Sequence, residues 1–445
     1  MRLDREAVPS ENAGEGGPSA AGSRFAGDAA YYFIVNGVMN VANYAFLLVA
    51  VRTLTKPEFG VFNALLALLT LSTVMMNSLL LHVARQVARI EPAERPGYWR
   101  ASQVRLAGAA IAGGAAAAIL TPAAWSVLGA TAGEWGAMLV AAAALLFVSA
   151  VSGIATGLQR MRLHANANLA GALVKLAIGA ALLAAGGGVS AALAAYGAGL
   201  LVSYALITRG MRSALGVVEH PSTEHDPDSV IPAPFHAVVR SREDARRPDA
   251  LRPGFVAAYL GLVAPFCLDQ VFVQALVRPL SGDYAALCTL AKIVFLCVGP
   301  LLLVMYSHVS SADSDAARRR RLLSGTLVAV LLIGGLLAGV LAVLAPWLTH
   351  LMLAPQYAHL APLVGLLAAG TLLHAVAHTL GLYSLALGRW SGLLASGVIP
   401  VAQAAAIALA PANLTVLVAI QCGAFAAQVV FTGAAVLRGT GRAPE

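Results

Sequence analysis

Charge is scarce in this chain. Only 11% of its 445 residues are acidic or basic, whereas 59% are apolar. Soluble domains carry about 25% charged residues, so most of this surface must face lipid or lie against protein within lipid. A soluble globular fold and a nucleic-acid partner are therefore not expected. The composition indicates an integral membrane protein whose main partner is the lipid bilayer.

Cysteines and catalytic motifs are also scarce. The four cysteines all lie in apolar stretches, where structural disulfides are not expected. The chain has no phosphate-binding GxxxxGK[ST] loop, no GxSxG turn, no CxxC pair and no paired catalytic carboxylates. His374 and His378 have the i, i+4 spacing of metal ligands, but their helix offers no third ligand. We therefore expect no cofactor, no metal site and no enzyme activity.

Long apolar stretches are abundant. Twelve of them have 19 or more residues, and about 20 residues cross the hydrocarbon core as a helix. Lys and Arg in short loops are retained in the cytoplasm, so the basic residues give the direction of each span. With twelve spans, 24 of the 29 basic residues fall on the side of the N-terminus, and only Arg52, Lys56 and Arg278 fall on the other side. The sequence predicts a multi-pass protein with both termini in the cytoplasm.

One short pattern occurs twice, 222 residues apart, as Leu54–Leu68 (LTKPEFGVFNALLAL) and Leu276–Leu290 (LVRPLSGDYAALCTL). A gap-free alignment pairs Lys56 with Arg278 and Gly60 with Gly282. Each copy stands between two long apolar segments at the same place in its half of the chain. The repeat predicts an all-α membrane protein of twelve transmembrane helices in two six-helix lobes, related by a rough twofold axis along the membrane normal.

The composition along the chain gives the domain boundaries. The start of the chain and the long loop between spans six and seven are polar and rich in proline or glycine, as flexible segments are. We expect a disordered cytosolic tail at 1–25, an N-terminal lobe at 26–209, a cytosolic interlobe linker at 210–252, a C-terminal lobe at 253–437 and a cytosolic tail at 438–445.

Three ionisable residues lie near the middle of predicted spans: Lys175, Asp269 and Lys292. A charge at that depth costs at least about 2.5 to 3.5 kcal/mol, so each must face a partner or a water-filled cavity. In one interpretation, Asp269 and Lys292 form a structural pair between neighbouring helices. In the other, the lysines line a transport cavity, and their excess positive charge binds an anionic headgroup.

Polar and basic residues of the first span of each lobe are further candidates for the cavity. Asn36 and Asn40, with Asn43, share one helix face, and Gln270 and Gln274 form a similar i, i+4 pair. Such faces either bind neighbouring helices or line a cavity. Arg52 and Arg278 stand at the outer ends of these spans, where they either attract phosphate at the outer gate or anchor the helices at the interface.

The pattern resembles the polysaccharide flippases of the O-antigen and capsule type, within the multidrug/oligosaccharidyl-lipid/polysaccharide exporter superfamily. The segments that carry the resemblance are the asparagine face of the first span, Arg52–Thr55, Glu58–Phe62, Gly157–Arg160, Asp269, Gly282–Tyr284 and Leu290–Lys292. The resemblance covers nearly the whole chain apart from the first 25 residues and the linker. It implies two six-helix bundles around a central cavity, and alternating access.

The resemblance also implies a function. We expect the chain to move an undecaprenyl-diphosphate-linked oligosaccharide across the bacterial inner membrane for polysaccharide assembly, with polysaccharide polymerase and glycosyltransferases as further partners. A cation-coupled multidrug antiporter of the same superfamily is the nearest alternative, although drug exporters usually need acidic cavities. A membrane-embedded glycan ligase or acyltransferase is the alternative from another class, but the predicted external loops are short and hold few acids or bases.

Overall fold

The described part of the protein is helical. The computed structural model describes residues 18–89, 95–119, 121–158, 160–212, 253–310 and 316–439, and these ranges contain helices and turns but no strand. Ten helical segments in them are long and apolar enough to cross a membrane, or eleven if the bent pair α3 and α4 is one span. With α2, a further helix of 34 residues, they account for the twelve predicted spans. The expected all-α membrane fold is confirmed.

The N-terminal lobe holds six of the spans. Their helices are α1 (Pro18–Thr53), α2 (Lys56–Arg89), α3 (Arg95–Ile119) with α4 (Thr121–Leu128), α5 (Ala132–Gly157), α6 (Met161–Ala184) and α7 (Gly188–Arg212). Helix α6 packs between α1 and α7, and α5 packs against α2 and α7. A capping box starts α5: the Thr131 hydroxyl accepts from the Glu134 backbone N–H, and the Glu134 carboxylate accepts from the Thr131 N–H.

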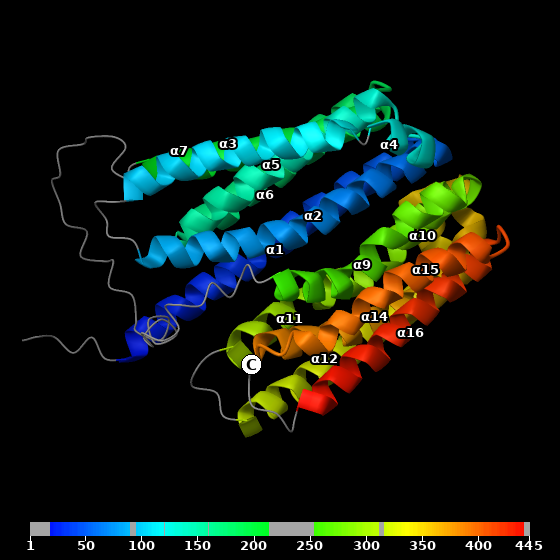
Figure 1. Ribbon diagram of the computed structural model, residues 1–445. Coiled ribbons are helices and arrows are strands. Elements are labelled where there is room, and N and C mark those ends of the chain that lie inside the picture. The colour runs from blue at the N-terminus through cyan, green and yellow to red at the C-terminus, as the bar shows by residue number, and fades with distance from the viewer. Residues whose placement is uncertain are drawn as a thin grey trace, which may run out of the picture.

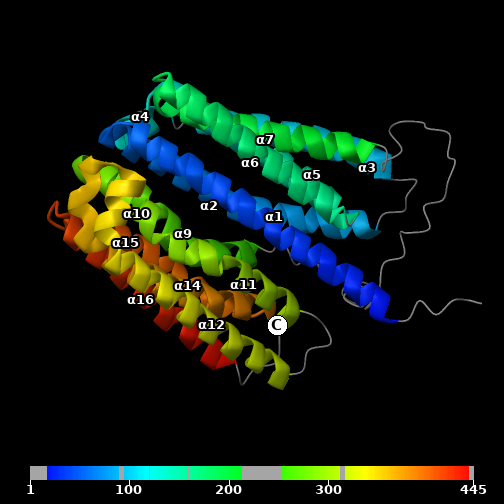
Figure 2. The same ribbon diagram turned by 180° about the vertical axis from the view of Figure 1, so that it is seen from behind.

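The C-terminal lobe holds the other six. Its segments are α9 (Pro253–Leu276), η4 (Arg278–Leu280), α10 (Ser281–Ala291), α11 (Ile293–Ser310), α12 (Ala316–Val343), α13 (Ala345–Leu348), η5 (Thr349–Leu353), η6 (Pro355–Leu360), α14 (Ala361–Ala386), η7 (Ser391–Gly397), α15 (Val398–Leu409) and α16 (Leu414–Gly439). Helices α10 and α11 form one predicted span that is interrupted at Lys292. Figures 1 and 2 show the two lobes side by side, with the N-terminal lobe in blue to green and the C-terminal lobe in green to red.

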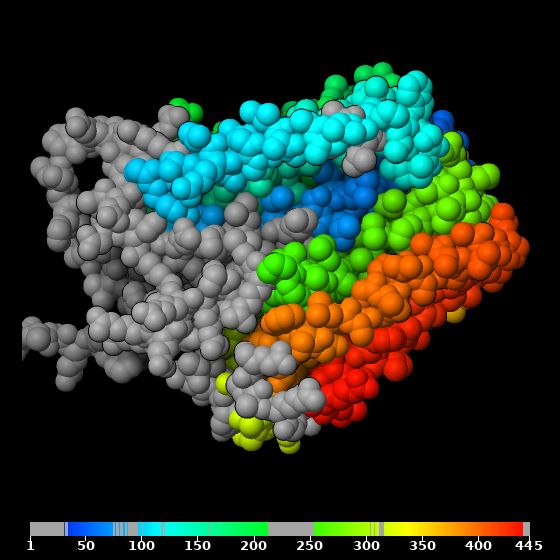
Figure 3. Space-filling model, viewed as in Figure 1, coloured from blue at the N-terminus to red at the C-terminus, as the bar shows by residue number. Residues whose placement is uncertain are grey.

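The lobes join at one end of the bundle. We call it the repeat end, because both repeat segments lie there, and we call the opposite end, where α1 begins and α16 ends, the terminal end. At the repeat end a single apolar cluster runs through both lobes and contains Phe59 and Phe62 of α2 with Tyr284 and Leu287 of α10. The other two buried clusters each stay within one lobe. In Figure 3 the lobes are in contact at the end where α4 and α10 lie.

The predicted domain boundaries remain predictions. The N-terminal tail up to residue 17, the linker from residue 213 to 252, and the last six residues lie outside the described residues. Among the described residues, α1 begins at Pro18, inside the segment expected as a tail, α7 ends at Arg212, α9 begins at Pro253 and α16 ends at Gly439.

Candidate substrate cavity

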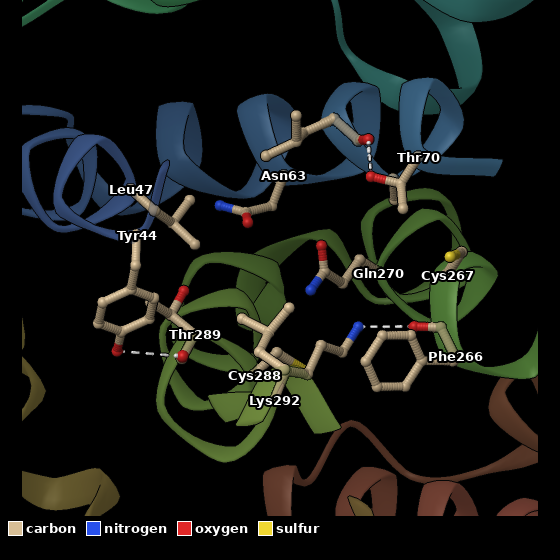
Figure 4. Close-up of a pocket in the computed structure, with 13 residues that line it drawn as sticks. Tyr44, Leu47, Asn63, Thr70, Phe266, Cys267, Gln270, Cys288, Thr289 and Lys292 are labelled. Atoms are coloured by element: carbon tan, nitrogen blue, oxygen red, sulfur yellow. Dashed lines mark hydrogen bonds between the residues drawn. The ribbon is translucent and has the colours of Figure 1, made fainter. Parts of the chain in front are cut away.

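A cavity of about 150 Å³ lies between the lobes. Its wall combines residues of α1 and α2 with residues of α9, α10 and α11, so both lobes contribute to it. Most of the wall is apolar, and its polar atoms come from a few side chains such as Tyr44, Asn63, Gln270 and Lys292 (Figure 4). The Tyr44 hydroxyl crosses between the lobes and donates to the Thr289 carbonyl oxygen at 3.3 Å.

Lys292 stands at the break between α10 and α11, and its ammonium group has three partners. It donates to the Phe266 carbonyl oxygen at 2.6 Å and to Asp269 Oδ1 at 3.1 Å. With the Gln270 amide in the orientation that suits both of its neighbours, Lys292 also donates to Gln270 Oε1 at 3.2 Å, and the Gln270 amide nitrogen donates to the Asn63 carbonyl oxygen at 3.1 Å. In Figure 4, Gln270 lies between Lys292 and Asn63 of the other lobe.

Asp269 lies behind Lys292 and does not reach the cavity surface. Its side chain is 0% exposed, whereas that of Lys292 is 17% exposed. The Asp269 carboxylate accepts from the Tyr284 hydroxyl at 3.1 Å and from the Gln270 backbone N–H at 2.8 Å, and Cys288 Sγ lies 3.6 Å from it. The expected contact between Asp269 and Lys292 is therefore present. Because only the lysine reaches the surface, the pair, which is neutral as a whole, presents its positive end to the cavity.

A set of glutamines supports the cavity wall from the C-terminal lobe, and sequence reasoning missed them. Pro265 interrupts the hydrogen bonding of α9 because proline has no N–H group. Gln421 donates to the Pro265 carbonyl oxygen at 2.9 Å, Gln403 donates to it at 3.3 Å, and Gln428 donates to the Leu262 carbonyl oxygen. The available signal was one glutamine in the apolar span of α15 and two, seven residues apart, in that of α16, together with a proline inside α9.

The two histidines of α14 belong to the same support. His374 Nδ1 pairs with Gln428 Oε1 at 2.8 Å, and its ring stacks on Phe266 at 4.5 Å between ring centres. His378 packs 5.6 Å from His374, centre to centre. No group of three side chains suited to a metal ion occurs among the described residues. These contacts fix the position of Phe266, whose ring lies 4.5 Å from Lys292 Nζ.

Lys175 lies elsewhere. Its ammonium donates to Asn43 Oδ1 at 2.6 Å and lies 4.5 Å from the centre of the Tyr196 ring and 5.3 Å from that of Phe46. The side chain is buried within the N-terminal lobe and does not line the cavity. The expectation that both lysines face the cavity therefore fits Lys292 and not Lys175. The physical reason is the rotation of α6, which turns this face toward α1 and α7.

The three asparagines on one face of α1 also lie outside the cavity wall. Asn43 holds Lys175, while Asn36 and Asn40 are half-buried and are not part of the cavity wall. On α9, Gln270 lines the cavity, and Gln274 lies one turn further toward the repeat end and outside it. The sequence predicted that these asparagines and glutamines could line a cavity, but of them only Gln270 does so.

Four side chains from the first spans and the repeat segments bridge the lobes at the repeat end. Arg52 of the N-terminal lobe donates to the carbonyl oxygens of Leu351 and Met352, the latter at 3.3 Å. At the position that aligns with Arg52, Gln274 of the C-terminal lobe donates to the Leu128 carbonyl oxygen at 2.6 Å. Each member of the aligned pair therefore donates a side-chain hydrogen bond to the backbone of the opposite lobe.

The other two bridging side chains, which are also aligned with each other, likewise reach from each lobe to the opposite one. Lys56 Nζ lies 2.8 Å from Asp283 Oδ1, and the aligned Arg278 donates to the carbonyl oxygens of Ser126 and Val127 at 3.0 and 2.9 Å. We call Arg52, Lys56, Gln274 and Arg278 the repeat latch. Neither role expected for Arg52 and Arg278 describes them fully, since both bind backbone of the opposite lobe.

Close backbone contact accompanies the repeat latch. A Cβ atom on Gly60 would overlap Ser281 Oγ, and one on the aligned Gly282 would overlap the Lys56 carbonyl group. Gly129 ends α4 with a left-handed φ of 69°, and the Arg278 guanidinium lies 3.2 Å from where its Cβ would stand. These glycines let the lobes approach closely and close the cavity at the repeat end.

Comparisons with known proteins show the fold. No family model and no curated protein matches the sequence. An inward-facing multidrug resistance MATE family transporter of the MOP superfamily has a TM-score of 0.67 at 13% identity, with 91% of this chain and 94% of that chain covered. The lipid II flippase MurJ in an inward closed conformation has a TM-score of 0.65 at 9% identity, covering 93% and 88%.

A third structure belongs to a MOP superfamily transporter from Pyrococcus furiosus, with a binding pocket of reversed polarity. Its TM-score is 0.54 at 15% identity, and 96% of each chain is covered. All three matches extend over nearly the entire chain, so they include both lobes. The chain has the fold of the MATE and MurJ transporters of the MOP superfamily.

Proposed function

We propose that this chain moves an undecaprenyl-diphosphate-linked oligosaccharide from one leaflet of the bacterial inner membrane to the other, for polysaccharide assembly. A transporter function is supported by the fold. The lipid-linked anionic substrate is supported by one observation above all. Of the described residues that line the interlobe cavity, Lys292 alone carries a formal charge at neutral pH.

The surroundings of Lys292 strengthen its attraction for a phosphate group. At an effective dielectric constant of about 20, opposite unit charges about 4 Å apart attract each other by about 4 kcal/mol, against about 1 kcal/mol in water. The wall around the ammonium is mostly apolar, and Asp269 is fully covered. A diphosphate attached to an apolar chain therefore matches both the charge and the wall of the cavity better than a cationic drug does.

The size of the cavity supports movement of the lobes. Its volume of about 150 Å³ admits a headgroup but not an oligosaccharide, since sites for drug-sized ligands measure about 300 to 1,000 Å³. The lobes are joined by the repeat latch and have separate apolar clusters toward the terminal end. In the proposed cycle the lobes separate first at one end and then at the other.

The orientation completes the proposal. The distribution of basic residues supports a cytoplasmic location of the termini and the terminal end, and in this proposal the repeat end is the external one. In this arrangement the substrate enters from the cytoplasmic leaflet, where glycosyltransferases make it, and leaves toward a polysaccharide polymerase outside.

A cell-based experiment tests the substrate. In cells that depend on this chain for surface polysaccharide, the variant D269N/K292Q should abolish the polysaccharide at normal protein amount, because it removes the cation without leaving its buried partner charged. K292R keeps the positive charge and should retain part of the export. A normal amount of polysaccharide with D269N/K292Q would rule out the cationic site. Loss of resistance to cationic drugs, with polysaccharide unchanged, would favour the multidrug alternative.

A further inference from the structure

Gln270 joins the cavity cation to the opposite lobe. Its amide oxygen accepts from Lys292 Nζ at 3.2 Å, and its amide nitrogen donates to the Asn63 carbonyl oxygen at 3.1 Å. Lys292 and Gln270 belong to the C-terminal lobe, and Asn63 lies on α2 of the N-terminal lobe. One small amide group therefore links the cation and the lobe interface.

The hydrogen bonds of Lys292 are fully used. A lysine ammonium has three N–H groups, and here they point to the Phe266 carbonyl oxygen, Asp269 Oδ1 and Gln270 Oε1. A phosphate oxygen that binds Lys292 directly must replace one of these three acceptors. If the phosphate replaced Asp269 as acceptor, a fully buried carboxylate would be left without its cation, which is costly. If the phosphate replaced the Phe266 carbonyl oxygen, the shortest of the three hydrogen bonds would be broken.

Gln270 is the acceptor most easily replaced. It is neutral, its bond to Lys292 is the longest of the three, and its side chain lines the cavity. An amide that turns away from Lys292 also gives up its bond to the Asn63 carbonyl oxygen, because both bonds use the same rigid group. Binding at Lys292 and contact between the lobes therefore compete for Gln270.

We propose that Gln270 is a positioning residue that couples anion binding to release of the lobes: a phosphate group displaces its amide from Lys292 and thereby breaks the Gln270–Asn63 link across the interface. This inference rests on the proposed function, since it takes an anionic headgroup as the ligand of Lys292. The lobe contact then loosens only when the substrate is present.

Affinity measurements on the purified full chain test the proposal, with farnesyl diphosphate as the probe and farnesol as the uncharged control. Q270L leaves one N–H group of Lys292 free, so it should bind farnesyl diphosphate about five-fold more tightly than wild type, the factor that corresponds to one net hydrogen bond. Q270E adds a carboxylate beside the ammonium and should lower the affinity at least ten-fold. T379V removes a buried hydroxyl that bonds its own helix away from the cavity, and should leave the affinity unchanged.

Hydrogen exchange supplies a second readout. In wild type, farnesyl diphosphate should speed exchange in the α2 segment around Asn63. In Q270L that exchange should be fast already and should not respond to the probe. A merely structural role would weaken binding in Q270L and leave the response of α2 intact. Tighter binding together with the lost response is therefore specific to the proposal.

The outcomes separate this inference from the proposed function. If wild type does not bind farnesyl diphosphate, or D269N/K292Q binds it equally well, the cationic substrate site is wrong and the inference fails with it. If binding depends on Lys292 but Q270L binds no more tightly than wild type, the role of Gln270 alone is overturned.

Discussion

At the scale of single residues, the cavity depends on an ion pair of which one member is hidden. Lys292 has a carbonyl, a carboxylate and an amide as acceptors, and Asp269 has a hydroxyl and a backbone N–H in addition to the lysine. Such complete satisfaction makes a buried pair tolerable, and removal of one member leaves an uncompensated charge.

Asp269→Asn should therefore destabilise the protein. We expect the free energy of unfolding to fall by about 3 kcal/mol, since the Lys292 charge loses its counter-ion in a nearly buried site. The double variant D269N/K292Q should regain part of this stability, because the two positions are in contact and their effects are not additive. Thermal unfolding of the purified variants and their amount in the membrane measure both effects.

A different result would assign Asp269 another role. If Asp269→Asn were as abundant and as stable as wild type but inactive, and the double variant did not restore activity, Asp269 would act as a coupling site for a proton or cation during transport. The ion pair would then be secondary to that role.

The sequence predicted how deep these residues lie but not which way they face. Counting along an apolar span places Lys175, Asp269 and Lys292 near its middle. The direction of Lys175 depends on how α6 is rotated between α1 and α7, and that is a property of packing between helices far apart in sequence. For the same reason the sequence did not predict the role of three glutamines, whose acceptors lie around Pro265 on another helix: Gln403, Gln421 and Gln428.

At the scale of elements, the repeated segments bind one another. Each copy contributes a glycine at the point of closest approach, Gly60 or Gly282, and a basic side chain that reaches the opposite lobe, Lys56 or Arg278. The gap-free alignment predicted two equivalent lobes. That the copies meet is a result of how the two lobes pack against each other.

Gly282→Ala should separate the lobes at the repeat end. The added methyl group would overlap the Lys56 carbonyl group, which is backbone and cannot move aside as a side chain can. Labelling of Cys288 measures the effect, because this thiol is fully buried beside the cavity. In a background that keeps Cys288 as the sole cysteine, a membrane-impermeant thiol reagent should label Gly282→Ala at least ten-fold faster than the parent.

Gly423→Ala is the matched control. It makes the same change in α16 at a position where a Cβ atom meets nothing within 4 Å, so labelling of Cys288 should stay at the parental rate. Equal labelling of all three proteins would show that the contact at Gly282 does not hold the lobes closed.

At the scale of the whole molecule, the lobes are in contact at the repeat end, a cavity lies between them, and Lys292 is the charged side chain among the described residues of its wall. The fold class, the number of spans and their division into two lobes could be predicted from apolar length and from the repeat, because both are properties of the chain itself. The latch and the Gln270 link could not, since each joins residues that only the assembled lobes bring together.

The most direct test of the account is transfer of substrate between leaflets. Proteoliposomes that contain wild-type protein and a fluorescent undecaprenyl-diphosphate oligosaccharide should move the lipid from one leaflet to the other, measured as its loss of protection from an impermeant quencher. Proteoliposomes with D269N/K292Q at equal protein content should show at most the rate of protein-free vesicles. Equal transfer by both proteins would contradict the claim that the Lys292 cation carries the substrate across.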